Sequence, residues 1–69
     1  HRRGERGMIK DNIRVARGAA NLTQTALADK IGVKQKDVSR WENGAREPSA
    51  TWIKKLAEAL NVSADDLLK

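Results

Sequence analysis

At 69 residues the chain is long enough for one domain with a modest core, and its lack of cysteine together with a single His at the first position argues against disulfides and metal sites. No apolar run reaches the about 20 residues that span a bilayer, and no charged-then-apolar leader is present, so we expect a cytoplasmic domain with no membrane anchor, metal or cofactor. Lys and Arg number 14 against 9 Asp and Glu, and this net charge of +5 favours a polyanionic partner.

Residues 1–7, HRRGERG, contain two glycines and no apolar side chain, so we expect a flexible basic tail that precedes a domain of residues 8–69. Two interpretations of Arg2, Arg3 and Arg6 stay open. They form either an arm that contacts nucleic acid or a solvated tail with weak, nonspecific attraction.

The first helix is predicted over residues 8–19, because Ile9, Ile13 and Ala16 recur at helical spacing and form an inward stripe. A second helix is predicted over residues 24–31, where the Thr23 hydroxyl can cap its start and Gly32 follows its end. A third is predicted over residues 35–42, with an acidic residue in its first turn and Gly44 after its end.

The fourth predicted helix spans residues 48–60, and a short fifth follows Ser63, which heads a pattern resembling a capping box that ends in Asp66. No segment shows strand alternation, so the fold class is all-α with five short helices. Trp52 lies off the apolar stripe of the fourth helix, either as a partly exposed candidate interface residue or as an indole folded over the edge of the core. The side chains expected to form the core are Ile9, Ile13, Leu22, Leu27, Ala28, Ile31, Val33, Val38, Trp41, Ile53, Leu56, Leu60, Val62 and Leu67.

The basic charge is concentrated toward the front of the chain. Residues 1–46 carry 11 basic and 5 acidic side chains, whereas residues 47–69 carry 3 and 4. Within the basic part, the third predicted helix has an outward polar face made of Gln35, Lys36, Ser39 and Arg40. Glutamine can bond adenine through two hydrogen bonds, and Lys or Arg can reach the guanine acceptors, so this face suits the major groove of DNA. A mixed polar helix face is nevertheless common in any protein.

Three motifs, LTQTALADKIGV, VSRWENGAREPS and LAEALNVSADDLL, together resemble the Cro/cI-type helix-turn-helix domain, also called the lambda-repressor-like or XRE family. The resemblance covers residues 9–68. It implies a compact five-helix domain in which the second and third helices form the helix-turn-helix. It also implies a regulator of transcription that binds double-stranded DNA sequence-specifically, as a repressor that recognises a pseudo-palindromic operator as a homodimer.

The resemblance also assigns roles to individual residues. It implies base readout by Gln35, Lys36, Ser39 and Arg40. It implies phosphate contacts by Thr23, Gln24, Lys34, Asn43 and Arg46, although for Lys34 and Arg46 a solvated loop charge is the alternative. It implies an ion pair between Arg17 and Glu42 that ties the first helix to the end of the third, with two independent surface charges as the alternative.

The chain departs from the family pattern at Lys34, where Ser or Thr often caps the third helix, and at Ala26, which replaces an acidic residue. Other functions remain open. The family also serves as the DNA-binding antitoxin of a toxin–antitoxin pair, which adds a protein partner, and a pure protein-interaction module is a third possibility. An enzyme is the weakest candidate because no His, Cys or clustered carboxylates occupy a plausible cleft.

Overall fold

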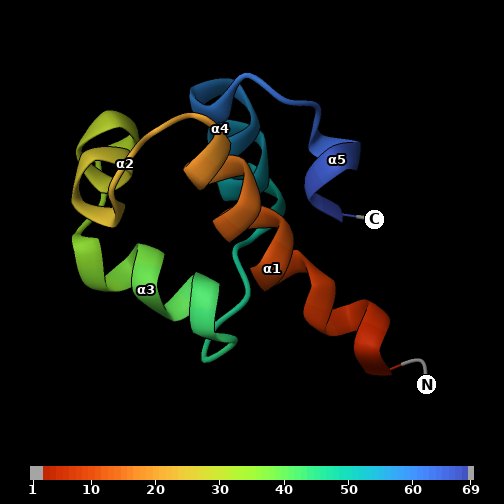
Figure 1. Cartoon of the computed structure of the whole chain (residues 1–69). Helices are drawn as coiled ribbons and strands as arrows, with labels where there is room; N and C mark the ends of the chain where they lie inside the picture. The colour runs from red at the N-terminus through yellow and green to blue at the C-terminus, as the bar shows by residue number, and fades with distance from the viewer. Residues whose placement is uncertain (1–2, 69) are drawn as a thin grey trace.

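The structure is a computed structural model that describes residues 3–68, with side chains described for residues 9–68. The described part is all-α and consists of α1 (Arg3–Ala19), α2 (Gln24–Ile31), α3 (Gln35–Asn43), α4 (Ala50–Leu60) and α5 (Ala64–Leu68) (Figure 1). The predicted five-helix architecture is confirmed. None of these helices is both long and apolar enough to cross a membrane.

The start of α1 differs from the prediction. The helix begins at Arg3 instead of Met8, so the backbone of residues 3–7 is helical where a tail was expected. Propagating an existing helix needs no new nucleus, and Arg and Glu are good helix formers, which offsets the two glycines. In Figure 1 this N-terminal part of α1 extends past the other helices. The side chains of Arg2, Arg3 and Arg6 lie outside those described, so both interpretations of them stay predictions.

Side-chain caps and left-handed residues set the ends of the shorter helices. Thr23 Oγ1 accepts a hydrogen bond of 3.0 Å from the backbone N–H of Ala26, and Gly32 ends α2 at φ +82°. A left-handed backbone is cheap only for glycine, so Gly32 allows the sharp turn into α3. At α5, Ser63 Oγ and the Asp66 carboxylate exchange hydrogen bonds with each other's backbone N–H, which is the predicted capping box.

One core joins all five helices. Nine of the residues expected there are buried: Ile13, Leu27, Ala28, Val38, Trp41, Ile53, Leu56, Leu60 and Leu67. The other five pack half-buried at its edge: Ile9, Leu22, Ile31, Val33 and Val62. Ala57 is buried as well. Helix α3 packs against both α2 and α1, so it is held from two sides.

Trp52 is half-buried and packs against this core, with its ring centroid 5.9 Å from that of Trp41 and the two ring planes 40° apart. It is therefore an indole folded over the core edge that also stays partly exposed, and the interface interpretation stays a prediction. Aromatic pairs at this spacing attract each other beyond the area they bury. The pair joins the inner face of α3 to α4.

Candidate nucleic-acid interface

Helix α3 has one buried side and one open side. Val38, Trp41 and Glu42 are buried, whereas three of the residues expected to read bases, Gln35, Lys36 and Arg40, are exposed and the fourth, Ser39, is half-exposed. A helix that is fixed along its inner stripe presents its outer side chains from a rigid backbone. The outer face of α3 can therefore be offered to a partner as a unit.

The ion pair expected between Arg17 and Glu42 is present and bidentate. Arg17 Nε lies 2.6 Å from Glu42 Oε2, and Arg17 Nη2 donates to Oε1 at 3.0 Å. The third nitrogen, Nη1, donates to the Leu22 carbonyl at 2.8 Å, so one guanidinium joins α1, the α1–α2 turn and α3. Glu42 is only 5% exposed, and its hydrogen bond raises the pKa of Arg17 above the ordinary value. Such fork-shaped pairs fix geometry as well as charge.

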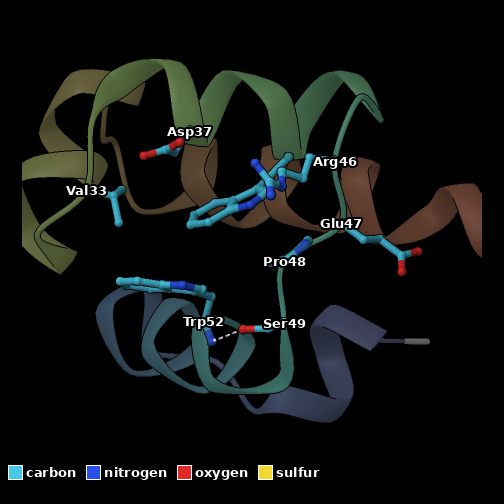
Figure 2. A pocket seen from close by; sticks show the side chains of 8 residues that line it. Val33, Asp37, Arg46, Glu47, Pro48, Ser49 and Trp52 are labelled. Atoms are coloured by element: carbon cyan, nitrogen blue, oxygen red, sulfur yellow. Dashed lines mark hydrogen bonds between the residues drawn. The ribbon is translucent and has the colours of Figure 1, made fainter.

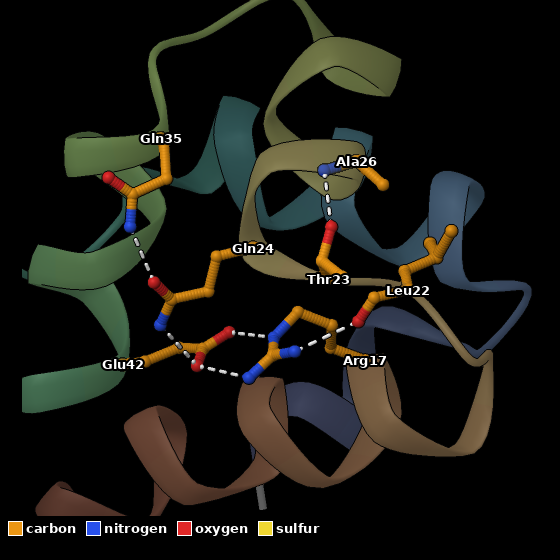
Figure 3. Close-up of polar contacts among 7 residues, drawn as sticks. All are labelled: Arg17, Leu22, Thr23, Gln24, Ala26, Gln35 and Glu42. Atoms are coloured by element: carbon orange, nitrogen blue, oxygen red, sulfur yellow. Dashed lines mark hydrogen bonds and ion pairs between the residues drawn. The ribbon is translucent and has the colours of Figure 1, made fainter.

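A chain of hydrogen bonds runs from this ion pair to the outer face of α3 (Figure 3). Gln24 Nε2 donates to Glu42 Oε1 at 3.0 Å, and Gln35 Nε2 donates to Gln24 Oε1 at 2.7 Å. A carboxylate only accepts, so Gln24 must turn its nitrogen to Glu42 and its oxygen to Gln35. The family resemblance implied that Gln24 can brace the recognition helix, and the structure shows the contact. Helical spacing alone does not predict it, because the paired residues are 18 and 11 positions apart and meet only through helix packing.

The start of α3 is capped in an unusual way. Lys34 occupies the N-cap position, and its ammonium group, having no lone pair, cannot accept from the helix backbone. Instead the Asp37 carboxylate accepts from the Lys34 backbone N–H at 3.3 Å. Only half of a capping box is therefore made. The Lys34 side chain is exposed, where a phosphate could reach it.

Donors also remain available among the other residues expected to bind phosphate. The Thr23 hydroxyl accepts from Ala26, which leaves its own hydrogen to donate. Asn43 Oδ1 accepts from the Ala45 backbone N–H at 2.8 Å, so its Nδ2 is the part of the amide left for a ligand. Arg46 is exposed in the loop that follows, and its backbone N–H donates to the Arg40 carbonyl at 3.2 Å.

A cleft of about 390 Å³ separates α3 from the start of α4 (Figure 2). It is lined by Val33, Asp37, Trp41, Arg46, Glu47, Pro48, Ser49 and Trp52. The Trp52 indole also lies under the Lys55 ammonium, 5.9 Å from the ring centroid. The cleft lies beside the outer face of α3, and its lining includes none of the four residues expected to read bases. Within the described residues, no group of three or more His, Cys, Asp or Glu side chains could hold a metal ion.

The model of the helix-turn-helix family matches residues 13–67. The chain belongs to this family. The lambda-repressor-like resemblance drawn from its motifs is thereby confirmed, with α2 and α3 as the helix-turn-helix.

Relatives and solved structures agree with this membership. The chain is 36% identical over 62 residues to the uncharacterized HTH-type transcriptional regulator YqaE of Bacillus subtilis, covering 90% of this chain and 53% of that protein. It is 36% identical over 59 residues to the cryptic phage CTXphi transcriptional repressor RstR of Vibrio cholerae, covering 86% and 53%. The P22 c2 repressor, solved in complex with a synthetic operator, is 34% identical with a TM-score of 0.84, covering 90% of this chain and 94% of that one. The chain spans about half the length of the two curated relatives.

Proposed function

We propose that this chain is a sequence-specific double-stranded-DNA-binding regulator of transcription, and that it is a repressor. The observation that carries the proposal is the presentation of α3. Its inner side is held by the bidentate pair between the partly buried Arg17 and the buried Glu42, while Gln35, Lys36 and Arg40 are exposed on its outer side. The P22 c2 repressor bound to its operator is a solved protein of the same fold, which supports DNA as the partner.

Base readout begins with Gln35. Its Nε2 gives one hydrogen to Gln24, which leaves the second Nε2 hydrogen and Oε1 for a ligand. One donor beside one acceptor matches the N7 and N6 edge of adenine in the major groove. Lys36 and Arg40 carry donors only, which suit guanine O6 and N7, and Ser39 can serve either base.

Phosphate contacts would set the register of α3 in the groove. Thr23 and Gln24 lie at the start of α2, Lys34 lies at the start of α3, and Asn43 and Arg46 follow at its end. Contacts at both ends of a recognition helix orient it without reading sequence. The cationic members also make affinity depend on salt, because they displace counterions from DNA.

Repression would require two copies of the domain. We propose a homodimer that places two α3 helices in successive major grooves, about 34 Å apart, on a pseudo-palindromic operator, where it blocks polymerase sterically. Such a regulator works in the cytoplasm, where prokaryotic DNA lies, and it catalyses no reaction.

Selection of binding sites from random DNA tests these statements together. We expect a pseudo-palindrome whose half-sites lie one helical turn apart, with adenine and guanine enriched within each half-site. Failure to enrich any sequence, or binding that ignores salt, would contradict the proposal. Enrichment of single, unpaired half-sites would contradict the proposed homodimer but leave the proposed DNA binding intact. Co-purification with a toxin encoded beside the gene would instead favour the antitoxin function.

A further inference from the structure

A second cleft, also about 390 Å³, opens where α3 ends against α1. Its lining includes Lys10 from α1, Asn43 and Gly44 from the end of α3, and Arg46 and Glu47 from the following loop. Asn43 and Arg46 are already expected at phosphate, but Lys10 is not. Its place in this cleft brings a cation from α1 to the end of the recognition helix.

The Lys10 side chain reaches that position by lying on Gly44. A Cβ atom added to Gly44 would fall 3.2 Å from Lys10 Cδ and 3.8 Å from Cε. The aliphatic part of the lysine therefore packs against bare backbone. Long cationic side chains often bury their stem in this way and keep the charged end in water. Gly44 thus serves two needs, because it also adopts φ +82°.

The charged end of Lys10 has no partner within residues 9–68. The ion pairs there are Arg14–Asp11 and Arg17–Glu42, and Glu47 does not pair with Lys10 although both line the cleft. A lysine that served only to cap α3 would donate to one of its last carbonyls. No such hydrogen bond is made among the described residues, so the ammonium remains available to an anion.

We propose that Lys10 is a DNA-contacting residue that binds, together with Asn43 and Arg46, one phosphate of the operator backbone at the end of α3. This inference rests on the proposed DNA-binding function. The two cations and the Asn43 amide line the same cleft and come from α1, from the end of α3 and from the loop that follows it. Helix α1, which otherwise only supports the helix-turn-helix, would then help to hold it on DNA.

The decisive variant is Lys10→Met, which keeps an unbranched stem to cover Gly44 and removes the charge. Its affinity for a selected operator and for a scrambled duplex is measured across a range of salt concentrations. We expect the plot of log affinity against log salt to become less steep by about 0.9 for one phosphate that is no longer neutralised, with similar changes on both duplexes. Lys10→Arg should keep the wild-type slope. Lys55→Met, which removes a charge from α4 beside Trp52, should keep it as well.

A wild-type slope in Lys10→Met would overturn the proposed phosphate contact, as would an affinity that falls by the same factor at every salt concentration. If the wild-type chain shows no salt-dependent binding to either duplex, the proposed function itself fails and this contact with it. Thermal unfolding of each variant ensures that the slopes are compared on folded protein.

Discussion

The side-chain oxygen of Gln24 accepts a hydrogen bond of 2.7 Å from the side-chain nitrogen of Gln35. The oxygen faces Gln35 because the side-chain nitrogen of Gln24 donates to the Glu42 carboxylate. The direction of the Gln35 amide is therefore set by a buried acid that it does not itself touch. Reversing the Gln35 amide would place its oxygen against the oxygen of Gln24. In this way the ion pair that holds α3 in place also decides which atoms α3 presents.

Gln24→Leu should weaken the preference for adenine at the position read by Gln35. A bidentate contact to a base discriminates against the wrong base by about 1–3 kcal/mol. Loss of the Gln24–Gln35 hydrogen bond should remove part of this discrimination. The measurement is a titration on operators that differ only at that base. Asn43→Ala is the control, since it should lower affinity for all of these operators alike. An unchanged ratio of affinities in Gln24→Leu would show that Gln35 orients itself.

Arg40→Ala should cost about 1–3 kcal/mol on a matched operator and much less on a scrambled one, because a base contact carries sequence information. Lys34→Ala should weaken both equally, as expected of a phosphate contact. Binding titrations on the two duplexes separate the roles. Equal losses on both duplexes for Arg40→Ala would remove it from base readout.

Lys34→Ser should stabilise the fold and weaken DNA binding. The serine hydroxyl supplies the missing N-cap acceptor, worth about 1 kcal/mol, and the change removes a cation from the positive end of the α3 dipole. Urea unfolding measures the gain, and salt titration of DNA binding measures the loss. A variant that is both more stable and equally tight on DNA would mean that Lys34 touches no phosphate.

Glu42→Ala should destabilise the domain by about 1–3 kcal/mol, because it removes the charged acceptor of two hydrogen bonds from the partly buried Arg17 guanidinium. Arg14→Ala breaks an exposed pair with Asp11 and should cost at most about 0.5 kcal/mol. Urea denaturation followed by circular dichroism compares the two variants. Similar losses would show that burial adds nothing to the Arg17–Glu42 pair.

The same pair predicts a pH dependence. Glu42 raises the pKa of Arg17 in the folded state. The stabilisation of the fold by charged Arg17 is therefore fully present below the ordinary arginine pKa. It is lost only in strongly alkaline solution, as the pH rises through the raised value. The contribution of Arg17 to stability should therefore stay constant from mildly acidic to mildly alkaline pH. A double-mutant cycle on Arg17 and Glu42, repeated across that range, would show any deviation.

Two glycines should respond oppositely to alanine. Gly44→Ala forces an L side chain into φ +82° and against the Lys10 stem, which should cost about 1–2 kcal/mol. Gly18 lies in the last turn of α1 with nothing within 4 Å of an added Cβ, so Gly18→Ala should gain about 0.5–1 kcal/mol. Thermal unfolding of both variants is the test, and a loss in Gly18→Ala would contradict it.

Most of the helices could be predicted from local patterns in the sequence. Apolar spacing located α2 to α5, and Thr23, Gly32 and Ser63 marked helix ends through the backbone geometry each favours. The start of α1 did not follow, because two glycines within residues 3–7 obscured how far an established helix propagates.

The candidate site was less accessible to prediction. Side chains on the outer face of α3 could be named from helical spacing alone. The path from Glu42 through Gln24 to Gln35 could not, because it depends on the angle at which α2 and α3 cross. The same holds for Lys10 over Gly44, since the contact joins positions far apart in the chain.

The two indoles provide the domain with an internal spectroscopic reporter. Trp41 and Trp52 are its only tryptophans, and Phe and Tyr are absent. Near-ultraviolet absorption and emission therefore arise from one pair of rings, 5.9 Å apart, with one member on α3 and the other on α4. Any rotation of α3 relative to α4 therefore alters the coupling between the two indoles. The movement of this helix on an operator can thus be followed optically in the unlabelled protein.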